Sequence, residues 1–401
     1  MDISERNVEV PNDKFLEISG PAVVRVREGK GKLMGRELSP ADIVIVPAWR
    51  TYAIRAVTPL KLSVSVSATS ELRVVDFNIA KVWEEALAKR DLSRVVIVGP
   101  TDSGKSSLVA TITNLLISKG ADRVTIVNTD VGQSNFCPPT MVCKTEVTDY
   151  VFTLQDLEPT VTKFTGTITP AVEQSRVIAA TASLVNGDYV MDTDGWVEGW
   201  DAAHYKRSLL QAVKPKLVIY LGKAPKWLTG PWEVISLPPS TGRARDREDR
   251  RFIRKVKYAK ALGKCGTLEL NLNEVPPLYS VTFNSPWSPE LRDEVEELIG
   301  TRPLLAFSWR NKVVAVVKKG SKYFVPRGSN VIVIEEGEEK GLLVALGDEE
   351  GNEVLGMVQK IDYLSKFMKV KSCFNGTPKY VSFGRVKLDE EFRDSVVNKP
   401  F

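Results

Sequence analysis

The residue types and spacing best suited to chemistry occur in one short stretch, G-P-T-D-S-G-K-S, which runs from Gly99 to Ser106. It follows the apolar run 94–98 and precedes a helical pattern over 107–118, and this order of strand, loop and helix is the context that a phosphate-binding loop needs. In such a loop, backbone N–H groups surround the β- and γ-phosphates, Lys105 places a positive charge on them, and the Ser106 hydroxyl can complete a Mg²⁺ shell. We therefore expect a nucleoside triphosphate to be held by Gly99, Pro100, Thr101, Asp102, Ser103, Gly104, Lys105, Ser106 and Ser107.

A second group of polar residues follows the next apolar strand, in the segment N-T-D-V-G-Q. The pattern places Asp130 and Gln133 at the carboxyl edge of the expected sheet, where ligands of doubly wound folds bind. A carboxylate there can hold Mg²⁺, orient water or accept a proton from a hydroxyl, and Gln133 can align a nucleophile or a phosphate. The simpler alternative is that Asp130 only caps a turn. His204, the one histidine in the chain, receives no role, so Asp130 is the best available general base.

Two turns further along the chain also end at this expected edge. The hydroxyl-rich segment 164–170 precedes a helical pattern, and the segment M-D-T-D-G-W ends a buried strand at Trp196. We expect both turns to open onto the site. Trp196 could stack on a base or pack in the core, and both interpretations stay open.

Arginine is concentrated between residues 240 and 258, in one expected helical segment. Ion pairs with neighbouring acidic residues would explain some of these side chains. A helix of this kind after the last sheet strands also suits a lid that closes over a triphosphate, which is the interpretation we favour. The arginines concerned are Arg243, Arg245, Arg247, Arg250, Arg251 and Arg254.

Composition excludes several classes of protein. The chain has 401 residues and a net charge of only +5, so any affinity for nucleic acid must come from local basic clusters. No apolar run of about 18 residues occurs, and the N-terminus is polar rather than a signal peptide, so we expect a cytoplasmic protein without membrane contact.

The four cysteines are too irregularly spaced for a zinc module, and we expect them to be reduced.

The pattern of apolar residues predicts an α/β fold in three parts. Residues 1–75 form an N-terminal β-rich, sandwich-like domain, and residues 76–264 form a central P-loop domain with a parallel sheet. The central domain includes a connecting helix at 77–90 and the arginine-rich lid at 240–260. Residues 265–401 form a C-terminal β-rich domain with one helix at 289–299.

Taken in order, these motifs resemble the polynucleotide 5′-hydroxyl kinases, the P-loop RNA kinases of pre-mRNA cleavage and pre-rRNA processing, and especially their archaeal members. The segment 31–38, G-K-L-M-G-R-E-L, is also similar to an element of that family's N-terminal domain, with Leu33 in place of the usual alanine. The resemblance implies transfer of the ATP γ-phosphate to the 5′-hydroxyl of an RNA or DNA end, with Mg²⁺ as cofactor, and the sequence leaves the choice between RNA and DNA open. RNA-processing proteins are the implied protein partners.

Residue roles also follow from the resemblance. Lys105 and Ser106 would bind phosphates and Mg²⁺, Asp130 would activate the hydroxyl, and Gln133 would help to order the metal and phosphates. The remaining implied roles are nucleic-acid contacts by Thr167, Thr169 and Trp196, and stabilisation of the transition state by the lid residues Arg247 and Arg251.

One position departs from the family pattern, because Asn128 stands where the family commonly has a first aspartate. An amide can hydrogen-bond a metal-bound water but adds no charge, so weaker Mg²⁺ binding is expected. Two alternatives to a kinase remain: a nucleotide-switch ATPase or GTPase that acts on a protein partner, and an ATP-binding scaffold without catalysis.

Overall fold

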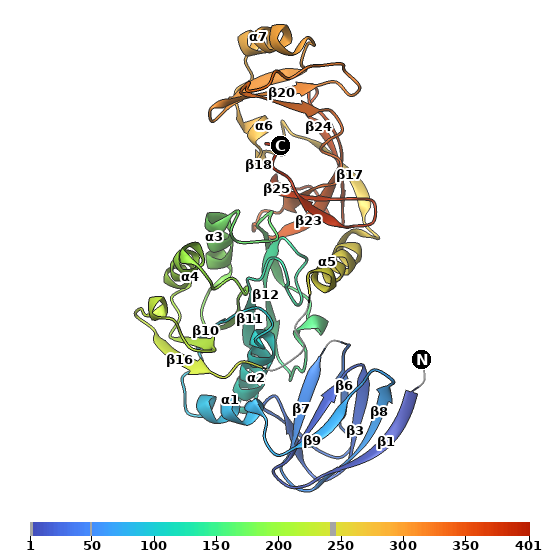
Figure 1. The fold of residues 1–401 in the computed structure, drawn as a ribbon, viewed down its shortest axis with the longest axis vertical. Coiled ribbons are helices and arrows are strands. Elements are labelled where there is room, and N and C mark those ends of the chain that lie inside the picture. The colour runs from blue at the N-terminus through green and yellow to red at the C-terminus, as the bar shows by residue number, and fades with distance from the viewer. Residues whose placement is uncertain (1–2, 49, 241–245) are drawn as a thin grey trace. The chain divides into compact units, whose positions relative to one another are not determined.

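The computed structural model describes residues 3–48, 50–240 and 246–401 (Figure 1). The chain divides into two compact units. Unit 1 comprises Met1–Asp130, Cys143–Thr160 and Thr181–Asp246, and unit 2 comprises Val131–Val142, Val161–Ala180 and Arg247–Phe401. The three-domain division expected from the sequence stays a prediction, and Arg243 and Arg245 of the expected lid lie outside the described residues.

The N-terminal part of unit 1 consists of two antiparallel sheets. The first has the strand order β1 (Ile3–Val10), β8 (Leu60–Ser67), β3 (Ala22–Glu28) and β6 (Ile43–Val46). The second has the order β5 (Arg36–Leu38), β4 (Gly31–Leu33), β7 (Thr51–Ala56), β2 (Phe15–Ser19) and β9 (Leu72–Val75). Exposed and buried residues alternate in β6 and β7, and the buried ones from both sheets form one hydrophobic core.

The P-loop part of unit 1 is built on a mixed sheet with the order β12 (Met141–Val147), β11 (Val124–Asn128), β14 (Tyr189–Asp192), β10 (Arg94–Val98), β15 (Leu217–Leu221) and β16 (Glu233–Leu237). All neighbouring pairs are parallel except β11 with β12, where Asn128 pairs with Cys143. The expected parallel sheet is thus confirmed with one antiparallel strand. Its direction reverses because the chain returns from β11 without a crossover helix.

Helices and short 3-10 turns connect these strands. The helices are α1 (Ile79–Leu87), α2 (Lys105–Ser118), α3 (Gln174–Leu184) and α4 (Trp200–Val213), and the 3-10 turns span Leu154–Asp156 and Lys226–Leu228. In the part of the chain that the structure describes, no helix is both long and apolar enough to cross a lipid bilayer. The cytoplasmic location stays a prediction.

Unit 2 holds β13 (Val161–Phe164), α5 (Arg247–Leu262) and two further sheets. The larger sheet has the order β17 (Gly266–Asn271), β24 (Phe367–Ser372), β23 (Glu353–Asp362), β22 (Leu342–Gly347), β25 (Tyr380–Leu388) and β18 (Pro277–Leu278), with β26 (Asp394–Val396) also on β25. The smaller consists of β19 (Leu305–Trp309), β20 (Lys312–Val317) and β21 (Val331–Glu335). The two sheets share one core, and the helices α6 (Val281–Asn284) and α7 (Pro289–Ile299) complete the unit.

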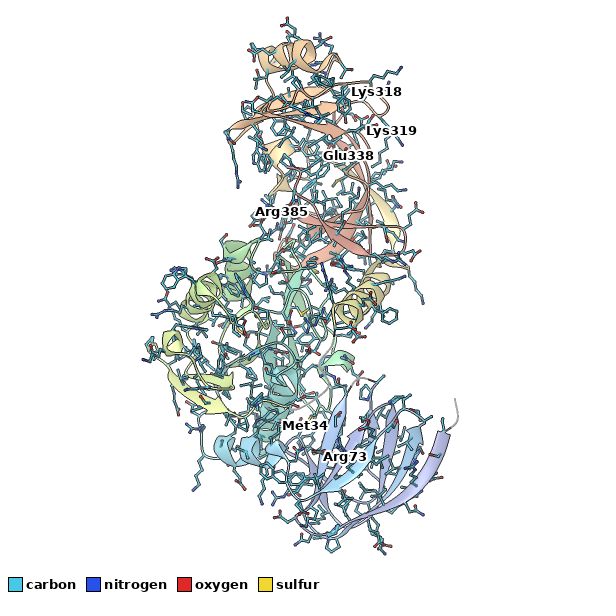
Figure 2. All side chains as sticks on the ribbon, in the orientation of Figure 1. Met34, Arg73, Lys318, Lys319, Glu338 and Arg385 are labelled. Carbon is cyan, nitrogen blue, oxygen red and sulfur yellow. A yellow bond between two sulfur atoms is a disulfide. The ribbon has the colours of Figure 1, made fainter. Side chains whose placement is uncertain are left out.

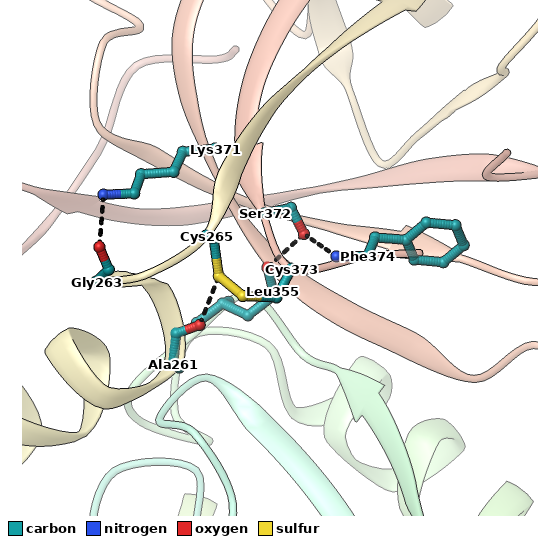
Figure 3. Close-up of a disulfide and its surroundings, with 8 residues drawn as sticks. All are labelled: Ala261, Gly263, Cys265, Leu355, Lys371, Ser372, Cys373 and Phe374. Carbon is teal, nitrogen blue, oxygen red and sulfur yellow. Dashed lines mark hydrogen bonds between the residues drawn. A yellow bond between two sulfur atoms is a disulfide. The ribbon is translucent and has the colours of Figure 1, made fainter. Parts of the chain in front are cut away.

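The prediction of reduced cysteines is wrong. Cys265 and Cys373 form a disulfide (Figure 3). The four cysteines all lie in the described residues, and none of them is free. The two residues are 108 positions apart, so their spacing gives no sign of the bond. Antiparallel pairing of β17 with β24 places Gly266 opposite Ser372, and the next pair outward is Cys265 with Cys373, whose Cα atoms are 4.6 Å apart.

Candidate active site

The phosphate-binding loop joins β10 to α2, as the sequence predicts. All four residues 95–98 of β10 are buried, the loop starts at Gly99, and α2 begins at Lys105. Gly104 has a φ of 95°, in the left-handed region that favours glycine. Because glycine occupies the N-cap position, no side chain of the described residues caps α2, and a helix N-terminus of this kind suits an anion.

Lys105 is only 8% exposed and lies within its own loop. Its Nζ donates hydrogen bonds to the carbonyl oxygens of Gly99 and Pro100, at 3.0 and 2.7 Å. Burial lowers the pKa of Lys105, and the nearby charges of Asp192 and Asp130 oppose that fall. A triphosphate would offer this ammonium group anionic oxygens in place of neutral carbonyls.

Ser106 and Asp192 form the pair that could hold a metal ion. The Ser106 hydroxyl donates a hydrogen bond of 2.7 Å to Oδ2 of Asp192, at the end of β14 beside the P-loop strand. Burial raises the pKa of Asp192 to about 6, although Lys105 and Ser106 act in the opposite direction. A hydroxyl and a carboxylate next to a P-loop are the protein ligands that Mg²⁺ takes in this class of site, and phosphate and water supply the rest.

Asp130 follows β11 at the same edge of the sheet. Its carboxylate is half-buried, and its charge acts on both Lys105 and Asp192. The backbone N–H of Asp130 donates to Oδ1 of Asn128 at 2.9 Å, so the asparagine side chain fixes the turn that presents the carboxylate. Asn128 is fully buried, its strand partner on β14 is Asp192, and its Nδ2 makes no hydrogen bond to any residue that the structure describes.

A buried ion pair supports the turn at the end of β14. Nζ of Lys206 lies 2.8 Å from Oδ2 of Asp194, and the two side chains are 1% and 6% exposed. The Tyr205 hydroxyl also donates to Asp194, and Oδ1 of Asp194 accepts the backbone N–H of Trp196. The indole ring stacks on Tyr205 with centroids 5.8 Å apart and is half-buried, so one of its faces is already covered.

This turn lies directly against the phosphate-binding loop. A Cβ atom on Gly195 would be 2.3 Å from Oγ1 and 2.7 Å from the backbone nitrogen of Thr101. Only glycine allows so close an approach of two backbones. The ion pair of Asp194 with Lys206 therefore positions a segment that touches the loop.

A cavity of about 750 Å³ lies in unit 1 beside the loop. Ser240, which lines it, donates its backbone N–H to the Ser103 carbonyl at 2.8 Å, and Trp83, which also lines it, donates its indole N–H to the Pro238 carbonyl. Met34 and Arg73, labelled in Figure 2, line it from the N-terminal sheets. Other lining residues are Arg50, Tyr52, Ser107 and Thr111. The volume and the mixture of apolar and polar walls fit a small organic ligand.

The other predicted site residues belong to unit 2. Nε2 of Gln133 donates to the Gly132 carbonyl at 2.8 Å and to the Arg250 carbonyl at 3.4 Å. The Thr167 hydroxyl is buried, donates to the Thr169 carbonyl and accepts the Thr169 N–H, which closes a tight turn. The structure thus brings Gln133 together with the arginine-rich helix and Thr167 together with Thr169.

The arginines of α5 differ in their surroundings. Arg247 and Arg251 are exposed at the start of the helix, whereas Arg254 forms a buried ion pair with Asp394 of β26 at 3.1 Å. Arg254 therefore has a structural role and does not pair with the acidic residues beside it in the sequence.

Two functional features were missed in the sequence. Asp192 received no role, although an acidic residue that ends a buried strand next to the P-loop strand is a usable signal. The contribution of the N-terminal sheets to the cavity had no such signal, because its lining residues are scattered along the chain.

Comparison with known proteins supports the resemblance. Residues 99–261 match the family model "mRNA cleavage and polyadenylation factor CLP1 P-loop". A polyribonucleotide 5′-hydroxyl-kinase of Pyrococcus furiosus is 28% identical over 324 residues, which cover 75% of this chain and 88% of the relative. A polyribonucleotide 5′-hydroxyl-kinase of Pyrococcus abyssi is 28% identical over 77% of this chain and 91% of the relative. One of Methanocaldococcus jannaschii is 25% identical over 74% of this chain and 87% of the relative.

Solved structures show the same fold. Clp1p in its complex with Pcf11p superposes with a TM-score of 0.59 at 13% sequence identity, over 96% of this chain and 98% of that chain. The resemblance predicted from the motifs is thus confirmed: this chain carries a CLP1-type P-loop and is a homologue of the archaeal polyribonucleotide 5′-hydroxyl kinases.

Proposed function

We propose that this protein is an ATP-dependent polynucleotide 5′-hydroxyl kinase that phosphorylates the 5′ end of RNA. The observation that carries the proposal is the juxtaposition in unit 1 of the loop lysine, the Ser106–Asp192 pair and the carboxylate of Asp130. Lys105, Ser106 and Asp192 suit the binding of a metal-bound triphosphate, and the carboxylate of Asp130 suits the role of proton acceptor. The names of the archaeal relatives point to RNA as the acceptor.

In this proposal the cavity beside the loop holds the adenosine part of ATP. Its volume is in the range of sites for small organic ligands, and Ser107 and Thr111 of α2 line it. The triphosphate then lies along the loop from Gly99 to Ser107, with Lys105 turned from the loop carbonyls to phosphate oxygens. Mg²⁺, held by Ser106 and Asp192 together with phosphate oxygens, supplies neutralisation of the phosphate charge.

The reaction needs only one proton acceptor from the chain. The 5′-hydroxyl oxygen of the acceptor forms a bond to the γ-phosphorus, and the bond from that phosphorus to the β–γ bridging oxygen breaks, so that ADP leaves. The hydroxyl proton passes to the carboxylate of Asp130. Asp192 is less suited to that task because its carboxylate already accepts the Ser106 hydroxyl.

Roles for residues of unit 2 are part of the proposal and rest on the family resemblance. Gln133 orders the metal and phosphates, Thr167 and Thr169 contact the nucleic-acid end, and Arg247 and Arg251 stabilise the transition state. Trp196 of unit 1 stacks on a base with the indole face opposite to Tyr205.

The test is transfer of label from γ-labelled ATP to 5′-hydroxyl RNA and DNA oligonucleotides with Mg²⁺. We expect label on the RNA from the wild type, and a loss of at least about a hundredfold in Asp130→Asn, since general-base catalysis contributes a factor of that size. Lys105→Ala is expected to lose both transfer and ATP binding.

The remaining outcomes separate the alternatives. Tight ATP binding without transfer to either oligonucleotide would refute the kinase and favour a scaffold. Steady ATP hydrolysis that is independent of oligonucleotide and unaffected by Asp130→Asn would favour a nucleotide switch.

A further inference from the structure

Positive charge is segregated in one part of the C-terminal region. Residues 300–334 contain seven lysines and arginines and no aspartate or glutamate, whereas the whole chain has a net charge of only +5. The rest of the chain is therefore slightly negative. A chain of such weak overall charge can bind a polyanion only through a cluster of this kind.

The structure places these residues around the three-stranded sheet of unit 2. Lys312 begins β20, Lys318 and Lys319 follow its end, and the loop 318–330 leads to the start of β21, which pairs in parallel with β20. Six residues at about 3.3 Å each separate Lys312 from Lys318 by about 20 Å. Figure 2 labels Lys318 and Lys319 at one end of this sheet. Lys312 and the pair Lys318 and Lys319 thus lie near opposite ends of β20, and the loop 318–330 carries the cations Lys322 and Arg327.

Exposed aromatic side chains lie among these cations. Phe324 is 70% exposed, and Tyr323 and Val325 are each 37% exposed. The backbone N–H of Phe324 donates to the carbonyl of Ile299, the last residue of α7, at 3.0 Å, and two further backbone hydrogen bonds close turns within the loop. These bonds tie the loop to α7 and close two of its turns, and the ring of Phe324 is presented to solvent.

Most of the nearby acidic groups are already engaged. Arg302 pairs with Asp293 and Glu296 of α7, Glu335 accepts the N–H of Gly320, and Glu338 pairs with Lys399. Glu294 and Glu297 of α7 and Glu336, which follows β21, also lie near this region in the sequence, and their negative charges weaken its positive potential. Six cations remain that are exposed and form no ion pair with any described residue: Arg310, Lys312, Lys318, Lys319, Lys322 and Arg327.

We propose that these six residues, together with Tyr323 and Phe324, form a binding surface for single-stranded RNA, which we call the basic loop surface. The cations contact phosphates, and the two rings stack on unpaired bases, so binding has little sequence preference. Double-stranded RNA is disfavoured because its bases are not free to stack on protein side chains. The choice of RNA over another polyanion rests on the proposed function.

The test measures binding without chemistry. A fluorescent single-stranded RNA of 20 nucleotides that carries a 5′-phosphate, and so offers no acceptor hydroxyl, is titrated with the full chain in the absence of ATP at several salt concentrations. We expect Phe324→Ala to weaken binding about tenfold through the loss of one stacked base. We expect Lys322→Gln and Arg327→Gln each to reduce the slope of log affinity against log salt by about 0.7.

Two substitutions elsewhere in unit 2 serve as matched controls. Phe367 on β24 is 48% exposed, and Lys360 on β23 is exposed. Phe367→Ala therefore removes an exposed aromatic ring, and Lys360→Gln an exposed positive charge, from outside the basic loop surface. Equal losses in the controls, unchanged affinity in the loop variants, or no RNA binding by the wild type would each overturn the proposal. The proposal would also be overturned if the loop variants lost binding to phosphatidylserine-containing vesicles but kept their affinity for RNA.

A parallel assay separates this proposal from the proposed function. Label transfer to a 5′-hydroxyl RNA of three nucleotides is measured for the wild type. Absence of transfer would refute the proposed kinase function. The binding data decide whether the basic loop surface binds RNA, whatever the result of the transfer assay.

Discussion

Replacement of Asp192 by asparagine is expected to stabilise the nucleotide-free protein while weakening its response to Mg²⁺. The pKa of this buried carboxyl is raised from 3.8 to about 6, so the folded state keeps the proton to a higher pH than the unfolded state does. Ionisation of the buried Asp192 lowers the free energy of unfolding. This loss is absent below about pH 4, grows as the pH rises, and is complete above about pH 6. Two pKa units correspond to about 3 kcal/mol in the free energy of unfolding.

This figure is an upper limit, because Asp192 also offsets the burial of Lys105. Asparagine keeps an oxygen that can accept the Ser106 hydroxyl, so the substitution removes mainly the charge. A gain of about 3 kcal/mol corresponds to a rise in melting temperature of about 6–12 °C for a domain of this size.

Thermal unfolding of the wild type and Asp192→Asn, measured from pH 4 to pH 8, checks the reasoning. We expect a higher melting temperature for the variant at pH 7.5, convergence of the two proteins near pH 4, and a smaller increase in the variant on addition of Mg²⁺ with ATP. The exposed Asp188 at the base of the same strand gives the control Asp188→Asn. A stability gain that is the same at all pH values, or no gain at pH 7.5, would refute the account of Asp192.

Three further predictions concern neighbouring residues. Lys206→Met leaves the Asp194 carboxylate buried without its cation, and we expect a loss of about 3–5 kcal/mol in urea-induced unfolding of the nucleotide-free protein. Gly195→Ala forces the turn away from Thr101, and we expect at least about a tenfold rise in KM for ATP with a smaller change in melting temperature. Asn128→Asp adds a carboxylate beside Asp192, and we expect a lower half-saturating Mg²⁺ concentration in label transfer together with a lower melting temperature without metal.

Two of these predictions have a matched control, and the third has a result that would contradict it. A Cβ on Gly266 would meet no atom within 4 Å, so Gly266→Ala should leave KM unchanged. Lys223 is exposed in unit 1, so Lys223→Met should leave the free energy of unfolding within about 0.5 kcal/mol of the wild type. An unchanged Mg²⁺ dependence in Asn128→Asp would mean that this position does not face the metal.

The sequence predicted best those features that depend on local patterns. The buried run before Gly99 and the apolar periodicity after Ser106 place β10 and α2 within two residues of their observed bounds. The helix expected over 289–299 is observed at those residues, where Ser288 caps its start and Gly300 ends it. Local rules suffice there because each element begins and ends with its own signals.

Features that depend on distant pairing could not be predicted in this way. The Cys265–Cys373 disulfide follows from the register of β17 against β24, which no local pattern fixes. Arg254 pairs with Asp394, 140 residues away, although acidic residues lie beside it in the sequence. Asp192 is recognisable only once β14 is known to lie beside β10.

The burial of these site residues explains why they lower the stability of the fold. Lys105 rests on neutral carbonyls, Asp192 is ionised at neutral pH despite its burial, and Nδ2 of Asn128 has no hydrogen-bond partner among the described residues. The metal-bound triphosphate proposed above would offer the lysine anionic oxygens and the carboxylate a cation. Under the proposed function, we therefore expect ATP with Mg²⁺ to raise the free energy of unfolding. If Asp192→Asn gains stability and loses its response to Mg²⁺ with ATP together, the two effects have this one cause; if they separate, the burial of Asp192 serves the fold and not the ligand.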